Sequence, residues 1–428
     1  MEQTLISVIL QLTFIIVTAR IFAAFFKKLG QPGVCGEMGA GLILGPSLFG
    51  RFFPHLFQHI FNPSVSLVFT MFSQVGLVLL LFLLGMDFEF HHLRTHGRKA
   101  LLVAVSAMAV PFALGLFLAR LLFPFVAQGI SFLGFSLFVA TALSITALPI
   151  LGIILIDFNL NRTEFGVIAI TSAALMDVAG WIVLATVSAV VRSTSQPWLA
   201  ARMLLEVLGF GAMMVLVVRP LAKRWVRYVL QRERQQVSIA TLAIVLALVF
   251  ASSLVTSWIG IFSIFGGFTM GAILFDEHEF RRLVSLRLEG FVRAFFVPIF
   301  FMYTGLRTDV GSMGGPVIWK LCLLVIVVAI VAKAVPSVIA GRISGLSWND
   351  SFSMGVLMNT RGLMELIVLN IGYDLGVVPK SVFFMFVVMA LVTTYMAAPL
   401  LRRSLAYANP AKSLMFEAEK TEELSIAN

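Results

Sequence analysis

One aspartate lies in the middle of a long apolar stretch. Asp177 is part of "TSAALMDVAGWIVLA", residues 171–185, and Ala173, Ala174 and Gly180 lie near it at helical spacing. An ionisable residue inside an apolar span costs at least ~2.5–3.5 kcal/mol on insertion scales, so its presence indicates a function. A carboxylate is a hard oxygen ligand, and burial favours its protonated form. Asp177 could therefore hold a proton or a metal cation by turns.

Two other apolar stretches are interrupted by polar or helix-breaking residues. The stretch "ATALSITALPILG", residues 140–152, contains Thr141, Ser144, Thr146 and Pro149. Because a helix break at membrane depth needs protein or water to satisfy the freed backbone groups, such a break predicts a cavity or a packed polar site. The hydroxyl groups and freed carbonyls there could complete an ion-binding shell around Asp177. A proline kink within a polar packing patch is the alternative.

The second interrupted stretch is "GVLMNTRGLMELIVLNIG", residues 355–372. Asn359, Thr360 and Gly362 break its apolar pattern. Breaks at matching places in two halves of a chain indicate a binding site, and both breaks together favour the site over the kink. Arg361 and Glu365 are four residues apart there, which is compatible with an internal ion pair or with gating. Both alternatives remain open.

Lys333 is a further charge far from either end of its apolar stretch, "VVAIVAKAVPSVIAG". A lysine can extend its side chain to the membrane interface, but this position favours a buried role. No basic residue lies three or four positions from Asp177. The sequence therefore predicts that Lys333, Arg361 and Glu365 compensate charge or act in gating.

The composition indicates that these elements lie within a membrane. The chain has 428 residues, of which 60% are hydrophobic and 12% are charged, and its mean hydropathy is +1.00. Long apolar runs recur throughout, which is typical of an all-α polytopic membrane protein. We expect about thirteen transmembrane helices, at residues 4–26, 33–50, 65–87, 98–123, 130–156, 165–191, 198–221, 237–256, 258–275, 291–307, 317–341, 350–373 and 380–404.

The basic residues alternate between connections. Segments such as "KKLGQ" and "HHLRTHGRK" follow odd-numbered spans, whereas connections after even-numbered spans have few Lys or Arg. This pattern predicts an outside N-terminus and a cytoplasmic C-terminus, in a membrane that we expect to be a bacterial inner (plasma) membrane. The net charge of +10 thus reflects these loops, and no nucleic-acid partner is expected.

The span count predicts a duplicated architecture. The seventh span separates two sets of six spans. Because the number of spans between the sets is odd, the two sets must have opposite orientations in the membrane. In addition, "GEMGAGLILG" in the second span is faintly similar to "GGFTMGAILF" in the ninth. We therefore expect two inverted six-helix repeats with two crossing discontinuous helices. The transmembrane domain is assigned to 1–406, with repeats at 4–191 and 237–404, a linking helix at 198–221 and a short cytoplasmic tail at 407–428.

Nothing in the sequence suggests an enzyme or a cofactor. There is no HExxH motif, no P-loop and no Ser/His/Asp arrangement in a shared context. Cys35 and Cys322 belong to no CxxC pair, and the histidines in loops lack a carboxylate or cysteine to complete a metal site. The histidines at 55 and 59 and at 91, 92 and 96 are interpreted as polar interfacial residues.

Taken together, these motifs resemble the monovalent cation:proton antiporter family 2, which includes Kef-type and plant cation/proton exchangers and has a sodium/hydrogen exchanger-like membrane domain. The resemblance covers residues 5–405 and rests on "LGQPGVCGEMGAGLILGPSLFG", "GLVLLLFLLGMDFE", "ALSITALPIL", "TSWIGIFSIFGGF", "VPIFFMYTGLRTD" and "MNTRGLMELIVLNIG".

The resemblance implies a mobile core of spans four to six and eleven to thirteen, and a scaffold that forms a homodimer. Asp177 would be the transport carboxylate, Lys333 the intramembrane lysine and Arg361 the basic residue of the second broken helix. Met176 departs from the family, which commonly has Asp, Asn or Gln there. Ser257 and Ser263 replace an acidic residue and a histidine found in many relatives.

The sequence as a whole favours secondary active antiport of a monovalent cation, Na⁺ or K⁺, against protons by alternating access. With one carboxylate beside Met176, we expect one-for-one, electroneutral exchange. The alternative is a gated, channel-like cation pathway or a transport-inactive membrane sensor. The lipid bilayer and the transported ions are the expected partners.

Overall fold

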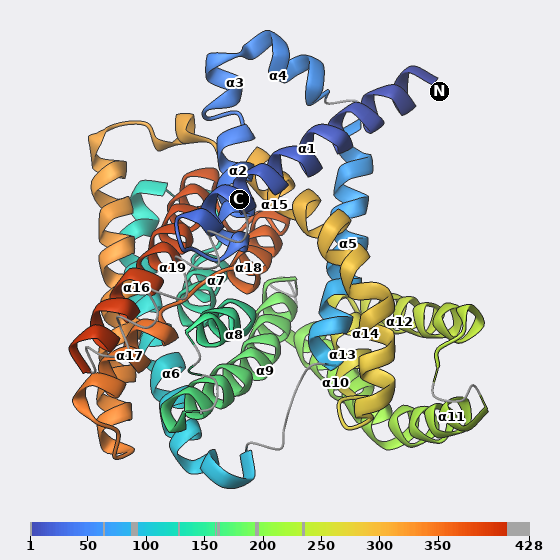
Figure 1. Cartoon of the computed structure of the whole chain (residues 1–428). Helices are drawn as coiled ribbons and strands as arrows, with labels where there is room; N and C mark the ends of the chain where they lie inside the picture. Colours follow the sequence, from blue (N-terminus) through green and yellow to red (C-terminus); the bar gives the residue numbers. More distant parts are fainter. Residues whose placement is uncertain are drawn as a thin grey trace. The chain divides into compact units, whose positions relative to one another are not determined.

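The computed structural model describes residues 2–62, 65–86, 93–126, 129–158, 160, 163–192, 197–232 and 236–408. Within these ranges the regular structure is helical (Figure 1). His91, His92 and residues 409–428 of the expected tail lie outside the described residues.

Nineteen α-helices are labelled in chain order within the described ranges. They are α1 (Glu2–Lys28), α2 (Gly33–Leu44), α3 (Phe49–Phe52), α4 (Pro54–Ile60), α5 (Ser66–Met86), α6 (Leu93–Val126), α7 (Phe132–Ser144), α8 (Leu148–Asp157), α9 (Glu164–Arg192), α10 (Pro197–Met213), α11 (Arg219–Arg232), α12 (Ile239–Ile259), α13 (Ser263–Ala272), α14 (His278–Phe291), α15 (Val297–Leu306), α16 (Pro316–Ile343), α17 (Trp348–Met358), α18 (Leu363–Asp374) and α19 (Lys380–Ala408). Short π-helical segments, Met214–Val218 and Val292–Phe296, join α10 to α11 and α14 to α15.

Ten segments of the described chain are long and apolar enough to cross a membrane. They match ten of the thirteen expected spans. The other three expected spans correspond to α2 and α13, which have only 12 and 10 residues, and to α15, whose 10 residues continue the helix of α14 through the π-helical segment Val292–Phe296. A helix of 12 residues rises ~18 Å, less than the ~30 Å hydrocarbon core, so the exact count of thirteen remains a prediction.

The seventh span is longer than expected. The expected linking helix ends at residue 221, but the helical segment that holds its apolar window runs from Leu205 to Arg232, and the basic helix α11 forms its last part. Arg219 and Lys223 of α11 both form ion pairs with Asp276, which lies between α13 and α14; the Arg219 Nη2–Asp276 Oδ2 distance is 3.1 Å. Burial raises the pKa of Asp276, but these two basic partners outweigh burial, and the pKa is lowered overall.

The chain divides into two compact units. The first contains Met1–Phe25, Gly36–His91 and Trp181–Gly311, and the second contains Phe26–Cys35, His92–Gly180 and Ser312–Asn428. The second unit thus holds both interrupted stretches together with Asp177 and Lys333.

Close backbone contacts characterise the first unit. A Cβ atom added at Gly305 of α15 would lie 1.9 Å from the Gly41 carbonyl oxygen of α2. A Cβ at Gly271 of α13 would lie 2.1 Å from the Phe82 carbonyl oxygen of α5. Because these obstacles are backbone atoms that cannot rotate away, the glycines are needed for the helices to approach so closely.

In the second unit, α7 packs on α6 and α18, and α16 packs on α6, α17 and α19 (Figure 1). A buried apolar cluster joins α6, α8, α9 and α17; Ala107, Leu151, Ala173 and Leu357 are fully buried within it. The two interrupted helices are therefore held by apolar packing on several sides.

Candidate ion-binding site

The first interruption separates α7 from α8. Ser144 ends α7 and Leu148 begins α8; Ile145 and Ala147 are extended, and Thr146 between them is non-helical. Pro149 lies in the first turn of α8, where its missing N–H removes no intrahelical hydrogen bond. Pro149 therefore starts the second half-helix and does not kink a continuous one.

The second interruption separates α17 from α18. Met358 ends α17, Leu363 begins α18, and residues 359–362 are non-helical. The Thr360 hydroxyl donates to the Leu357 carbonyl at 2.8 Å. A Cβ at Gly362 would lie 2.1 Å from Ile150 Cδ1, so the absence of a side chain leaves room for α8.

The two interruptions contact each other. The Ala147 amide donates to the Thr360 carbonyl at 3.3 Å, and the Thr146 hydroxyl donates to the Met358 carbonyl at 3.1 Å. Backbone groups that neither helix can satisfy alone are thus satisfied by the other break. The two predicted discontinuous helices are present, and they meet at their breaks.

Two cationic side chains bind the carboxyl end of α7. The Arg361 guanidinium donates to the Ala142 and Leu143 carbonyls, both at 2.8 Å, and the Lys333 ammonium donates to the Ser144 carbonyl. The last carbonyls of a helix lack intrahelical donors and carry its negative dipole end, which favours cations. Lys333 and Arg361 therefore share one helix terminus.

Glu365 partly neutralises this pair of cations. Its Oε2 lies 3.3 Å from Arg361 Nη1, and the side chains of Arg361 and Glu365 are 0% and 1% exposed. Lys333 also interacts electrostatically with Arg361, Glu365 and Asp177. The internal Arg361–Glu365 ion pair, one of the two alternatives from spacing, is present.

Asp177 lies on α9 and is 7% exposed. Its carboxylate interacts with the Leu148 backbone N–H, at the amino end of α8, and with the charge of Lys333. Positive helix ends and ammonium groups favour a carboxylate anion. Among the described residues, no hydrogen-bond donor reaches Asp177 Oδ1.

The other predicted binding residues differ in what they contact. Thr141 and Ser144 donate their hydroxyls to carbonyls of their own helix, at 2.7 and 2.9 Å. The Thr146 hydroxyl reaches Met176 Sδ at 3.7 Å in addition to the Met358 carbonyl. Asn359 Oδ1 is buried, and no described donor reaches it. Cation coordination by these groups remains a prediction.

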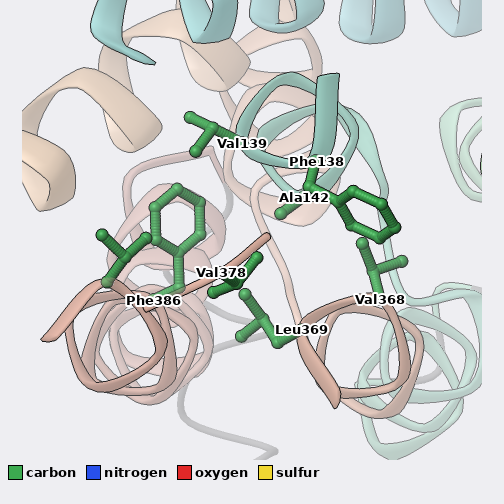
Figure 2. Close-up of a pocket in the computed structure, with 8 residues that line it drawn as sticks. Phe138, Val139, Ala142, Val368, Leu369, Val378 and Phe386 are labelled. Atoms are coloured by element: carbon green, nitrogen blue, oxygen red, sulfur yellow. The ribbon is translucent and has the colours of Figure 1, made fainter. Parts of the chain in front are cut away.

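An apolar pocket borders α7 on the side of α18 and α19 (Figure 2). It is a narrow gap between side chains with no room for a water molecule. Its lining residues are Phe138, Val139, Ala142, Val368, Leu369, Val378, Val382 and Phe386. None of them offers a polar side chain to an ion, so this pocket belongs to the apolar surroundings of the site and not to the site itself.

Sequence reasoning missed Thr394 of α19. Its hydroxyl accepts a hydrogen bond from the Arg361 amide at 3.0 Å and donates one to the Arg361 carbonyl. In the sequence, the only indication of this role is that the pair Thr393–Thr394 interrupts an apolar stretch. Because hydroxyls within spans usually bond to carbonyls of their own helix, this interruption alone does not predict a contact with another helix.

Comparisons with known proteins agree with this arrangement. The family model described as "Sodium/hydrogen exchanger, transmembrane" matches residues 14–404. The chain is 36% identical over 402 residues to the Na⁺/H⁺ antiporter NhaS4 of Synechocystis sp., a match that covers 93% of this chain and 97% of that protein.

Two eukaryotic relatives are similar over part of their length. Cation/H⁺ antiporter 17 of Arabidopsis thaliana is 35% identical, and the match covers 97% of this chain and 50% of that protein. K⁺/H⁺ antiporter 1 of Saccharomyces cerevisiae is 30% identical, with 91% and 45% covered. The chain thus spans about half the length of these two relatives.

A solved structure has the same fold. The sodium proton antiporter MjNhaP1 from Methanocaldococcus jannaschii superposes with a TM-score of 0.68 at 15% identity, and the match covers 96% of this chain and 99% of that chain. The similarity extends over nearly the whole of both chains.

Proposed function

We propose that this chain, which belongs to the sodium/hydrogen exchanger family, exchanges a monovalent cation, Na⁺ or K⁺, for protons across a membrane by alternating access. The observation that carries the proposal is the buried Asp177 carboxylate beside two crossing helix breaks, with one oxygen lacking a donor among the described residues. The relatives named above as Na⁺/H⁺, K⁺/H⁺ and cation/H⁺ antiporters support it.

In this mechanism the proton and the cation compete for Asp177. A proton on the carboxylate removes the negative charge that a cation needs, and a bound cation stabilises the ionised form. Thr146, carbonyls freed at the breaks, and Asn359 would supply further oxygens. Thr141 and Ser144 would contribute hydroxyl oxygens, since donating a hydrogen bond leaves lone pairs available.

Lys333 and Arg361 would offset the Asp177 charge when the site is empty. Glu365 would offset one of these two cations, because it forms an ion pair with Arg361. Each occupant, a proton or a monovalent cation, then adds the same charge to the cluster. The exchange is therefore proposed to be one-for-one and electroneutral.

The decisive experiment measures uphill transport in proteoliposomes. With the membrane potential clamped at zero, an imposed Na⁺ or K⁺ gradient should drive protons against their own gradient, a result that a channel cannot produce. Asp177→Asn should abolish this flux while the protein folds, and Asp350→Asn, at the start of α17, should retain it. Normal flux in Asp177→Asn would reject Asp177 as the site. If the wild-type protein transported no alkali cation, the sensor alternative would be favoured.

The proposal includes the architecture and membrane placement expected from sequence. Residues 4–191 and 237–404 would form inverted repeats joined by the segment 198–221, in a homodimer of a bacterial inner membrane. The N-terminus would be outside and the C-terminus cytoplasmic, as the basic loops indicate. Labelling of single cysteines placed near each terminus, in a variant lacking Cys35 and Cys322, would test this orientation.

A further inference from the structure

The break between α17 and α18 leaves the backbone of Arg361 outside any helix. Its N–H and C=O groups are buried, and a buried backbone group without a partner destabilises the fold substantially. A single side chain from another helix satisfies both groups. The Thr394 hydroxyl accepts from the Arg361 N–H at 3.0 Å and donates to the Arg361 carbonyl oxygen.

This contact holds the backbone of Arg361 in place. The Arg361 side chain extends from there to α7, the first half of the other broken helix. The Arg361 guanidinium bonds to the Ala142 and Leu143 carbonyls at 2.8 Å. These carbonyls immediately precede the break before α8, whose first amide interacts with Asp177. A continuous set of contacts thus joins Thr394 on α19 to the surroundings of the candidate carboxylate.

We propose that Thr394 is a positioning residue for cation binding. Its hydroxyl holds the unwound segment of the second broken helix, and so holds the Arg361 guanidinium on the end of α7. Loss of the hydroxyl lets the end of α7 shift relative to α8, which weakens cation binding more than it slows turnover. This inference rests on the proposed function.

Thr393 supplies a matched control. It neighbours Thr394 in the same helix, and the two side chains are 0% and 1% exposed. The Thr393 hydroxyl donates to the Met389 and Ala390 carbonyls of its own helix, at 2.8 and 3.2 Å. Thr→Val at either position removes a buried hydroxyl at nearly constant volume, but only Thr394→Val releases the backbone of a break.

The test compares Thr394→Val, Thr393→Val and Thr394→Ser in proteoliposomes, with half-saturating cation concentration and maximal rate measured separately. Loss of hydrogen bonds to two buried groups should raise the half-saturating concentration about tenfold or more in Thr394→Val. Thr393→Val should remain within about twofold of wild type, and Thr394→Ser within about threefold. The maximal rate should change less than the half-saturating concentration in all three.

Equal half-saturating concentrations in the two valine variants would overturn the inference. If Thr394→Val does not fold, Thr394→Cys decides, because a thiol is a weak donor and acceptor. An increase of about threefold or more would support the inference, and wild-type affinity would overturn it. Failure of the proposed function would look different, because the wild-type protein would then show no cation-driven proton movement.

Discussion

The buried ion pair of Arg361 and Glu365 gives a quantitative prediction. Glu365→Gln removes a charge that lies 3.3 Å from Arg361 Nη1, where both side chains are at most 1% exposed. At an effective dielectric constant of about 20, this pair attracts by about 5 kcal/mol. Because glutamine still accepts a hydrogen bond but leaves a buried charge unpaired, we expect a destabilisation of about 3–5 kcal/mol. Lys333, on the same helix end, would add repulsion.

An exposed pair with the same spacing provides the control. Arg202 and Glu206 are also four residues apart and are closer together, at 2.8 Å, but their side chains are 59% and 34% exposed. A surface pair of this kind contributes about 0.3–0.5 kcal/mol. Glu206→Gln should therefore change stability hardly at all, although distance alone would predict the larger effect there.

Thermal unfolding in detergent, monitored by intrinsic fluorescence, measures both variants. Glu365→Gln should lower the midpoint by several degrees, and Glu206→Gln by less than about one degree. Replacing both partners of the buried pair by apolar residues, Arg361→Met with Glu365→Leu, should destabilise less than Arg361→Met alone, because no charge is left unpaired. Equal midpoints for the two glutamine variants would refute the assignment of a strong buried pair.

Two further predictions concern the first unit. Gly305→Ala should prevent close approach of α2, because its Cβ would lie 1.9 Å from the Gly41 carbonyl oxygen, and should lower the unfolding midpoint by several degrees. Gly290→Ala, with open space around its Cβ, should raise it slightly. The pKa of Asp276 is lower in the folded protein than in the unfolded chain, where it is about 3.9. Its ion pairs therefore stabilise the fold at pH values above about 3.9, and this stabilisation is lost as the pH falls through the folded pKa. Asp276→Asn should therefore be less stable than wild type at pH 7, and the difference should begin to shrink below about pH 4 and vanish only below the lowered folded pKa; a difference independent of pH would contradict this reasoning.

The sequence was sufficient to locate the two helix breaks. Hydroxyl residues before Pro149, and the run from Asn359 to Gly362, mark positions where an apolar helix cannot continue. It was also sufficient to single out the intramembrane charges, because charged residues are rare in apolar spans. Family membership followed from the same motifs.

The lengths of α2 and α13 were harder to predict. Their apolar composition continues into the flanking residues, so hydropathy alone overestimates the helix. The hydrogen bonds from Arg361 to the Ala142 and Leu143 carbonyls join residues that are 219 and 218 positions apart in the sequence, and no local pattern encodes them. Thr394 was missed for the same reason, since its function depends on a distant backbone segment.

The hydrogen bonds between the two breaks constrain any movement of the second unit. The Ala147 amide donates to the Thr360 carbonyl, and the Thr146 hydroxyl donates to the Met358 carbonyl, so one main-chain and one side-chain hydrogen bond join the two half-helix junctions. In the proposed mechanism, a movement that exposes Asp177 to one membrane face and then to the other would carry both junctions together as one body. The oxygens proposed to bind the ion would then keep the same mutual arrangement on both faces of the membrane.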